Sequence, residues 1–138
     1  MLPHDKGLGG HSDGDVLLHA ITDALLGAIA APDIGALFPP SDARWKGADS
    51  VVFLNEALTR ARREGYHVSN LDCSLILVAP KIGPHTAAIR GRVAELLGVP
   101  PECVGLKAKT PEGLNLPNTV IAHVVVLLEQ ALKAKRRT

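Results

Sequence analysis

Apolar residues recur with the spacing of an α-helix in three stretches of the chain, residues 13–30, 49–64 and 84–98. In the first stretch the pattern is formed by Val16, Leu17, Ala20, Ile21, Ala24, Leu25 and Ala28. Residues three and four positions apart share one face of a helix, so each stretch predicts a helix with one buried side. Gly65 follows the second stretch and Gly98 closes the third, as is typical of helix C-termini.

Two other stretches alternate between apolar and polar positions, which predicts β-strands. Over residues 70–79, apolar side chains alternate with polar ones such as Asp72 and Ser74, and residues 103–109 repeat the alternation more briefly. Residues 118–134 are apolar at most positions, and we interpret them as a deeply buried final helix. His123 would then be a hydrogen-bonded helix residue and not a metal ligand.

This order of elements predicts an α/β (α+β) sandwich, with helices on one face of a small mixed sheet. The 138 residues suffice for one domain, 1–138, with a core of its own. Two strands make a poor sheet, however, and residues 1–12 are polar and glycine-rich with no strand of their own. We therefore expect that strands are missing at the N-terminal end.

Composition narrows the class of protein. Apolar residues make up 46% of the chain but aromatic residues only 3%, so the core is expected to be aliphatic. The formal net charge of +1 gives no sign of a nucleic-acid or membrane surface. Cys73 and Cys103 are interpreted as reduced and structural, because nothing else indicates secretion. Without a membrane-spanning run or a signal peptide, the chain is expected to be cytoplasmic.

The polar chemistry is concentrated where a glycine-rich loop becomes the first predicted helix, in the sequence KGLGGHSDGD at residues 6–15. Ser12 stands where an N-cap is expected, and Asp15 follows three residues later, as in a capping box. His11 lies beside the unpaired N–H groups of the helix start, which is a natural position for a phosphate.

One face of the same helix carries Asp15, His19 and Asp23, each four residues after the one before. A neutral imidazole at His19 is suited to bind a metal ion. The alternative is a capped amphipathic helix with solvated acids and one hydrogen-bonded histidine, and for an isolated pattern this alternative is favoured. The loop over 31–49 has a similar ambiguity, because Asp33 and Asp42 also suit ordinary turns.

The sequence of these segments resembles that of the 2-C-methyl-D-erythritol 2,4-cyclodiphosphate synthase family of the non-mevalonate isoprenoid pathway. The shared motifs are KGL, HSDGD, LHA and DALLGA at the first helix, then DIG and LFP at 33–39, WKGADS at 45–50, APK at 79–81 and KAKTPEGL at 107–114. They cover nearly the whole chain in the expected order, so the resemblance is specific.

The resemblance implies a lyase that forms homotrimers with active sites between neighbouring subunits. Its substrate would be 4-diphosphocytidyl-2-C-methyl-D-erythritol 2-phosphate, a cytidine diphosphate compound. The 2-phosphate attacks the β-phosphorus, which closes 2-C-methyl-D-erythritol 2,4-cyclodiphosphate and expels CMP. The family uses two divalent metals, one of the zinc class and one of the magnesium or manganese class. No nucleic acid or membrane partner is implied.

The resemblance also implies roles for single residues. His19 would bind the zinc-class metal and Glu112 the magnesium-class metal, while His11 and Thr110 would stabilise the transition state. His11 and Ser12 would hold phosphate. The methylerythritol part would contact Asp33, Ile34 and Gly35, with Phe38 to Asp42 as a flexible loop over it. The cytidine would be bound by the segment from Leu77 to Gly83, which includes Ala79, Pro80 and Lys81. On the sequence alone, without this resemblance, Lys81 is interpreted as an ordinary exposed lysine.

The sequence departs from the family at two places. Family members open with strands that carry a D-x-H pair of zinc ligands, and nothing before His11 matches that pair. We expect truncation more than loss of the site, with a non-catalytic relative that binds CMP or phosphate as the alternative. The second departure is Lys109, where many members have threonine, followed by LNLPNTVIAH in place of a GRGEG run. Lys109 is hypothesised to neutralise diphosphate charge, and a plain surface lysine is the alternative.

Overall fold

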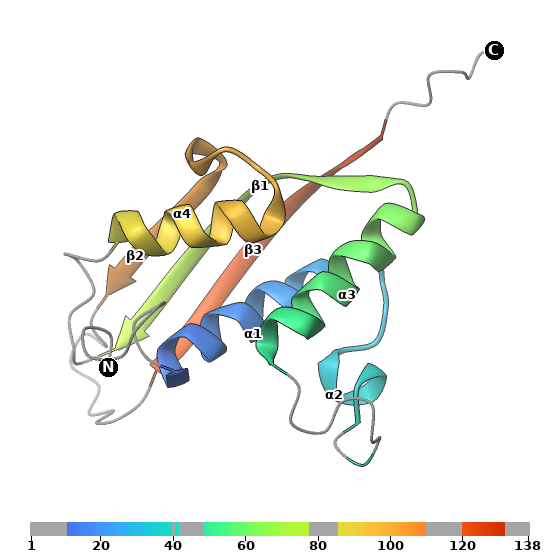
Figure 1. The fold of residues 1–138 in the computed structure, drawn as a ribbon, viewed down its shortest axis with the longest axis horizontal. Helices are drawn as coiled ribbons and strands as arrows, with labels where there is room; N and C mark the ends of the chain where they lie inside the picture. Colours follow the sequence, from blue (N-terminus) through green and yellow to red (C-terminus); the bar gives the residue numbers. More distant parts are fainter. Residues whose placement is uncertain (1–10, 40, 42–48, 78–85, 110–119, 132–138) are drawn as a thin grey trace.

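The computed structural model describes residues 11–39, 41, 49–77, 86–109 and 120–131, in which helices cover one face of a three-stranded sheet (Figure 1). In chain order the elements are α1 (His11–Ala28), α2 (Ile34–Leu37), α3 (Ser50–Arg63), β1 (Tyr66–Leu77), α4 (Thr86–Leu97), a short 3-10 turn (Pro101–Cys103), β2 (Val104–Lys109) and β3 (Val120–Gln130). None of the helices within these residues combines the length and apolar character needed to cross a bilayer.

The sheet has the order β2-β1-β3, and its central strand pairs in both directions. β1 runs parallel to β2, with Leu71 opposite Val104, and antiparallel to β3, with Leu77 opposite Val120. The parallel pair is joined through α4, because parallel neighbours need a crossover connection. The predicted α+β sandwich with helices on one face of a small mixed sheet is thus confirmed.

The core between the helices and the sheet is aliphatic, as the composition predicts. α1 packs against β3 and α3, and its buried face includes Leu17, Ile21 and Leu25, each at most 1% exposed. Leu71, Cys73 and Leu75 point inward from β1, which confirms the predicted alternation over the described part of residues 70–79. The core cluster also contains one buried aromatic side chain, Phe38, among the described residues.

The expected final helix over 118–134 is wrong, because residues 120–130 form β3, antiparallel to β1. Many of its residues are Val or Ile, whose branched Cβ suits a strand better than a helix. From His123 onward, exposed and half-buried side chains alternate along the strand. Both faces are apolar, so the alternation was invisible in the sequence. His123 is therefore an exposed strand residue, and β3 adds a third strand to the two that were predicted.

Three element boundaries also differ from the predictions. α1 begins at His11, so Ser12 lies inside the first turn and not at the N-cap. The loop predicted over 31–49 contains α2, whose N-cap is Asp33. β1 starts at Tyr66, four residues early, because its first residues pair with the end of β3, a contact distant in sequence.

The two cysteines are free thiols, as expected from the sequence. Burial, together with the nearby Asp72 carboxylate, raises the pKa of the Cys73 thiol to about 12, while Lys107 acts in the opposite direction. A thiol with this pKa stays protonated at neutral pH and is a poor nucleophile. Cys73 is accordingly a core residue.

Replacing Gly65 by alanine is expected to destabilise the fold by about 1–2 kcal/mol, because this residue has φ +92°, which side chains with a Cβ avoid. Gly91→Ala is the matched control. Gly91 lies in α4 with nothing within 4 Å of an added Cβ, so alanine there should stabilise by about 0.5–1 kcal/mol. Urea unfolding at one protein concentration measures both. Equal shifts of the two variants would contradict the assignment of the left-handed turn.

Candidate functional site

The exposed face of α1 presents Asp15 and His19 one turn apart, as their spacing predicts. Ser50, the first residue of α3, lies against both side chains. Its hydroxyl donates a hydrogen bond to Asp15 Oδ1 at 2.8 Å, and its oxygen lies 3.3 Å from His19 Nε2. An imidazole, a carboxylate and a hydroxyl therefore form one cluster across two helices.

The sequence around Ser50 explains why its hydroxyl is available to α1. Asp49 is the N-cap of α3, and its carboxylate accepts from the backbone N–H of Val51 at 3.4 Å. Ser50 is therefore not needed as a cap, and it is only 5% exposed. Sequence reasoning missed this residue. Its signal was the aspartate before it, which takes the capping role that a serine near a helix start usually has.

Two aromatic rings extend the cluster toward α2. The Phe53 ring, one turn beyond Ser50, lies with its centroid 6.2 Å from that of His19. Phe53 in turn packs on Phe38 with a centroid distance of 5.0 Å. Phe38 was expected in the loop over the substrate, and in this structure its side chain is 4% exposed and belongs to the core cluster. The rings connect the α2 segment to the His19 ring.

The second acid of this α1 face, Asp23, holds α2 in place. Its Oδ1 accepts from the backbone N–H of Ile34 at 3.1 Å, while Asp33 Oδ1 accepts from Ala36 N–H at 3.0 Å. Gly35 follows in the same turn, and a Cβ there would meet Asp33 Oδ1 at an ordinary 3.7 Å. The structure thus brings Asp33, Ile34 and Gly35 together as one short turn anchored to α1.

Asp23→Ala is expected to loosen this turn, because it removes the acceptor of the Ile34 N–H. The bond is exposed, so the stability loss should be small, about 0.5–1 kcal/mol. Amide hydrogen exchange at Ile34 should nevertheless become clearly faster. Glu95→Ala is the control, since Glu95 is an exposed acid on α4 that pairs with Arg92. Unchanged exchange at Ile34 in the Asp23 variant would contradict the anchoring role.

A second group of predicted residues lies at one end of the strands. β1 and β2 terminate at this end of the sheet, β3 begins there, and α1 starts beside it (Figure 1). Lys109 is exposed at the end of β2, opposite Ile76 of β1. The remaining predicted residues lie outside the described part of the chain: Asp42, Ala79, Pro80, Lys81, Thr110 and Glu112, together with the side chains of His11, Ser12 and Leu77.

The donor atoms of the His19 cluster match part of a metal site. The His19 imidazole suits a divalent cation of the zinc class, while the Asp15 carboxylate accepts the Ser50 hydroxyl. A catalytic zinc normally has three protein ligands, and the described residues contain no group of three histidine, cysteine, aspartate or glutamate side chains that could hold a metal. The cluster therefore fits as part of a metal site, and further ligands would have to come from outside the described residues.

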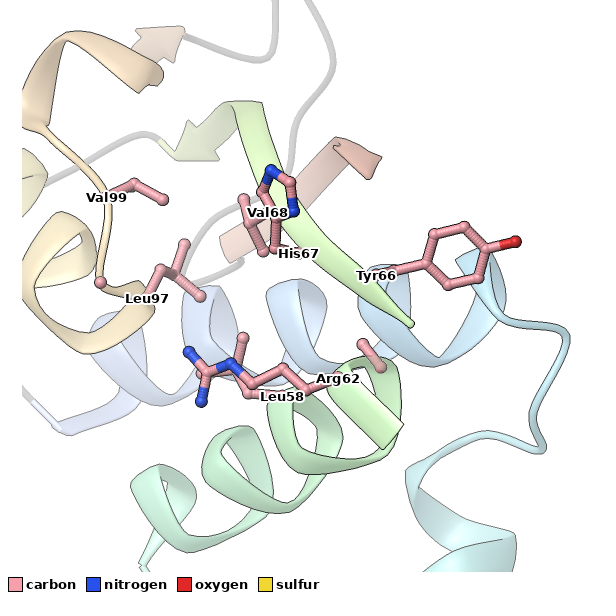
Figure 2. A pocket seen from close by; sticks show the side chains of 9 residues that line it. Leu58, Arg62, Tyr66, His67, Val68, Leu97 and Val99 are labelled. Carbon is pink, nitrogen blue, oxygen red and sulfur yellow. The ribbon is translucent and has the colours of Figure 1, made fainter. Parts of the chain in front are cut away.

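A small cavity of about 100 Å³ lies at the other end of β1 (Figure 2). Leu58 and Arg62 approach it from α3, Leu97 from α4, and His67 and Val68 from the start of β1. Its lining is mainly aliphatic, and His67 Nε2 is engaged with Glu129 Oε1 at 3.3 Å. This cavity is separate from the His19 cluster, and its lining brings together no catalytic set of side chains.

Comparison with known proteins gives a consistent result. The model of the YgbB family matches residues 1–129. A 2-C-methyl-D-erythritol 2,4-cyclodiphosphate synthase of Koribacter versatilis is 68% identical over 129 residues, covering 94% of this chain and 83% of the relative. The chloroplastic enzyme of the same name from Oryza sativa is 53% identical over 130 residues, covering 92% of this chain and 59% of the longer relative.

A solved structure is similar as well. It is a 2C-methyl-D-erythritol-2,4-cyclodiphosphate synthase in its CDP-bound form, 44% identical, with a TM-score of 0.78. The match covers 81% of this chain and 74% of that chain. Sequence and fold thus indicate the same group of proteins.

Proposed function

Because the chain belongs to the YgbB family, that of 2-C-methyl-D-erythritol 2,4-cyclodiphosphate synthase, we propose that it catalyses this cyclisation. Its substrate is 4-diphosphocytidyl-2-C-methyl-D-erythritol 2-phosphate. An oxygen of the 2-phosphate bonds to the β-phosphorus, and the bond from that phosphorus to the oxygen of the α-phosphate breaks. CMP leaves with the electron pair, so the step consumes neither water nor an oxidant. The protein is thus a phosphorus–oxygen lyase.

The observation that carries this proposal is the His19 cluster in a chain 68% identical to a named synthase. The reaction brings two anionic phosphates into line, so catalysis depends on positioning and on neutralising charge. Ser50 and Phe53 orient the His19 imidazole at the surface of α1. Asp23 orients the Asp33 turn beside it. These contacts supply the fixed geometry that such a reaction requires.

The α1 side of the site binds the phosphates and the methylerythritol unit. His11 and Ser12 hold phosphate at the start of α1, since the first N–H groups of a helix have no partner within the helix, and His11 stabilises the transition state. The turn of Asp33, Ile34 and Gly35 binds the methylerythritol part, and the segment that leads from Phe38 to Asp42 covers it, with the Phe38 side chain anchored in the core. Support for this part comes from the Asp23–Ile34 bond, which fixes the turn.

The end of the sheet where β1 and β2 terminate binds the cytidine part of the substrate. The segment from Leu77 to Gly83, with Ala79, Pro80 and Lys81, receives the cytidine, and Thr110 stabilises the transition state. Lys109 neutralises diphosphate charge. Support comes from the sheet, which places the last residues of β1 and β2 side by side, and from a similar structure that is a CDP-bound form.

Two divalent metals complete the proposal. His19 is a ligand of a zinc-class ion and Glu112 of a magnesium- or manganese-class ion. When bound, such ions neutralise phosphate charge and polarise the reacting phosphoryl group. The residues of this chain then have the task of holding the phosphates in line at the start of α1 and at the end of β2.

The active form is a cytoplasmic homotrimer of single-domain subunits. Val125 and Leu127 of β3 are 71% and 56% exposed on the sheet face that the helices do not cover. Val124 and Val126, the alternate residues, pack against the core. Exposed apolar side chains on a sheet face are typical of an interface. We assign this open face, with Val125 and Leu127, to contact between subunits.

The proposal is tested by incubating the chain with the substrate, Zn²⁺ and Mg²⁺ and measuring released CMP. Release at an enzymatic rate that EDTA abolishes supports the synthase. A chain that binds CDP but releases no CMP would contradict it and would instead be a non-catalytic relative that keeps the nucleotide site.

A further inference from the structure

Ser50 is one of two buried polar side chains among the described residues, and its hydrogen bonds are unlike those of the other. The second, Thr22, donates to the Leu18 carbonyl one turn earlier at 2.8 Å, an ordinary contact within a helix. The Ser50 hydroxyl instead reaches two side chains of another helix, 35 and 31 residues away in sequence. A buried hydroxyl that fixes two side chains at the surface of α1 needs an explanation beyond the stability of α3.

The direction of these hydrogen bonds follows from the number of donors. An ionised carboxylate only accepts, so Ser50 must donate its single proton to Asp15 Oδ1. The serine oxygen then has only lone pairs left for its second neighbour. His19 Nε2, 3.3 Å away, must therefore carry the proton of that contact and donate it.

This direction decides which imidazole nitrogen is open to a ligand. A neutral imidazole carries one N–H, so a proton on Nε2 leaves the lone pair on Nδ1. Among the described residues, the hydrogen-bond contact of the His19 ring is made by Nε2. Histidine ligands of metals commonly donate their other ring N–H to a neighbouring group, which sets the tautomer and the ring orientation. The Asp15–Ser50 pair has the chemistry of such a neighbouring group.

The same turn of α3 restrains the ring a second time. Phe53, three residues after Ser50, packs its ring against the imidazole at a tilt of 59°. The hydroxyl fixes one ring nitrogen while the phenyl group limits rotation of the ring plane. Both restraints come from α3, so the orientation of His19 depends on how α3 begins.

We propose that Ser50 is a positioning residue, which holds His19 with Nε2–H toward α3 and presents Nδ1 to a divalent cation. This inference rests on the proposed function, because it takes His19 as a metal ligand. Ser50 itself touches neither the metal nor the substrate. Its contribution is to select one tautomer and one ring orientation before the cation binds.

The first test measures the tautomer in the metal-free protein by long-range ¹H–¹⁵N correlation of the imidazoles, at a pH where they are neutral. His19→Gln identifies the His19 signals. The wild-type protein should show the Nε2–H tautomer, and Ser50→Ala should show a mixture. Ser50→Thr retains the hydroxyl and should retain the tautomer. An Nδ1–H tautomer in the wild type, or no change in Ser50→Ala, would overturn the proposal.

The second test measures Zn²⁺ affinity by competition with a chelator. Ser50→Ala should bind Zn²⁺ about 10–100-fold more weakly, the usual effect of losing a hydrogen-bond partner of a ligand. Thr22→Val is the matched control, since it removes the other buried hydroxyl of this region and should leave the affinity unchanged. Equal affinities of Ser50→Ala and the wild type would contradict the positioning role.

The two tests separate this inference from the proposed function. A wild-type chain that binds no Zn²⁺ removes the metal role of His19 and with it the inference. A wild-type chain that binds Zn²⁺ and releases CMP, with the same tautomer in Ser50→Ala, leaves the synthase standing and overturns only the role of Ser50.

Discussion

His19→Ala is expected to lower the rate of CMP release by at least about 100-fold, because an ion that neutralises phosphate charge contributes several kcal/mol to such reactions. The imidazole is the one metal-binding side chain of the proposed zinc site that the structure describes. It is exposed on α1, so its removal leaves no large cavity and the fold should persist. The measurement is kcat and KM for CMP release with both metals present, with circular dichroism as the check on folding.

His67→Ala is the matched control for this prediction. His67 is also an exposed histidine, but it lies at the start of β1 and contacts Glu129 on the surface. Its removal should change the rate by less than about twofold, since a surface pair contributes little. If the His19 and His67 variants retained similar activity, the assignment of His19 would be wrong.

Val125→Lys is expected to dissociate the trimer. The side chain is 71% exposed in the single chain and lies on the open face of the sheet, where we assign the subunit contact. An unpaired charge buried in an interface costs about 3–5 kcal/mol, so association should weaken by at least about 100-fold. Analytical ultracentrifugation measures the assembly. CMP release should fall with it, because the proposed active sites lie between subunits.

Val52→Lys is the control, with the same substitution at another exposed valine. Val52 is 43% exposed and lies on α3, away from the open face of the sheet. Its lysine should remain solvated and the trimer intact. A Val125 variant that assembles like the Val52 variant would contradict the assignment of this face.

The elements that could be predicted from the sequence are those with one apolar face and one polar face, because the two kinds of residue then recur with a clear period. The helix predicted over 49–64 is confirmed as α3 at Ser50–Arg63. Its apolar face and its charged residues recur with the helical period, and a glycine follows its end. The segment now seen as β3 was predicted wrongly. Its outer face is apolar too, with Val125 and Leu127 exposed in the single chain, so neither a period of 2 nor of 3.6 stood out.

The site was predictable in part for a similar reason. Asp15 and His19 share a helix face, and their separation of four residues sufficed to place them together. Ser50 is 31 residues further along than His19, and only the packing of α3 on α1 brings its hydroxyl to the ring. The pairing of Asp23 with Ile34 is likewise a contact between separate elements. Such contacts have no local pattern from which they could be inferred.

The central claim is that this chain cyclises its substrate, and the mass of the second product tests it most directly. After incubation with Zn²⁺ and Mg²⁺, the proposed mechanism predicts one cyclic diphosphate for each CMP, with no oxygen incorporated from ¹⁸O-labelled water. A product heavier by one labelled water would show that the diphosphate is hydrolysed. Hydrolysis in place of cyclisation would contradict the proposed function.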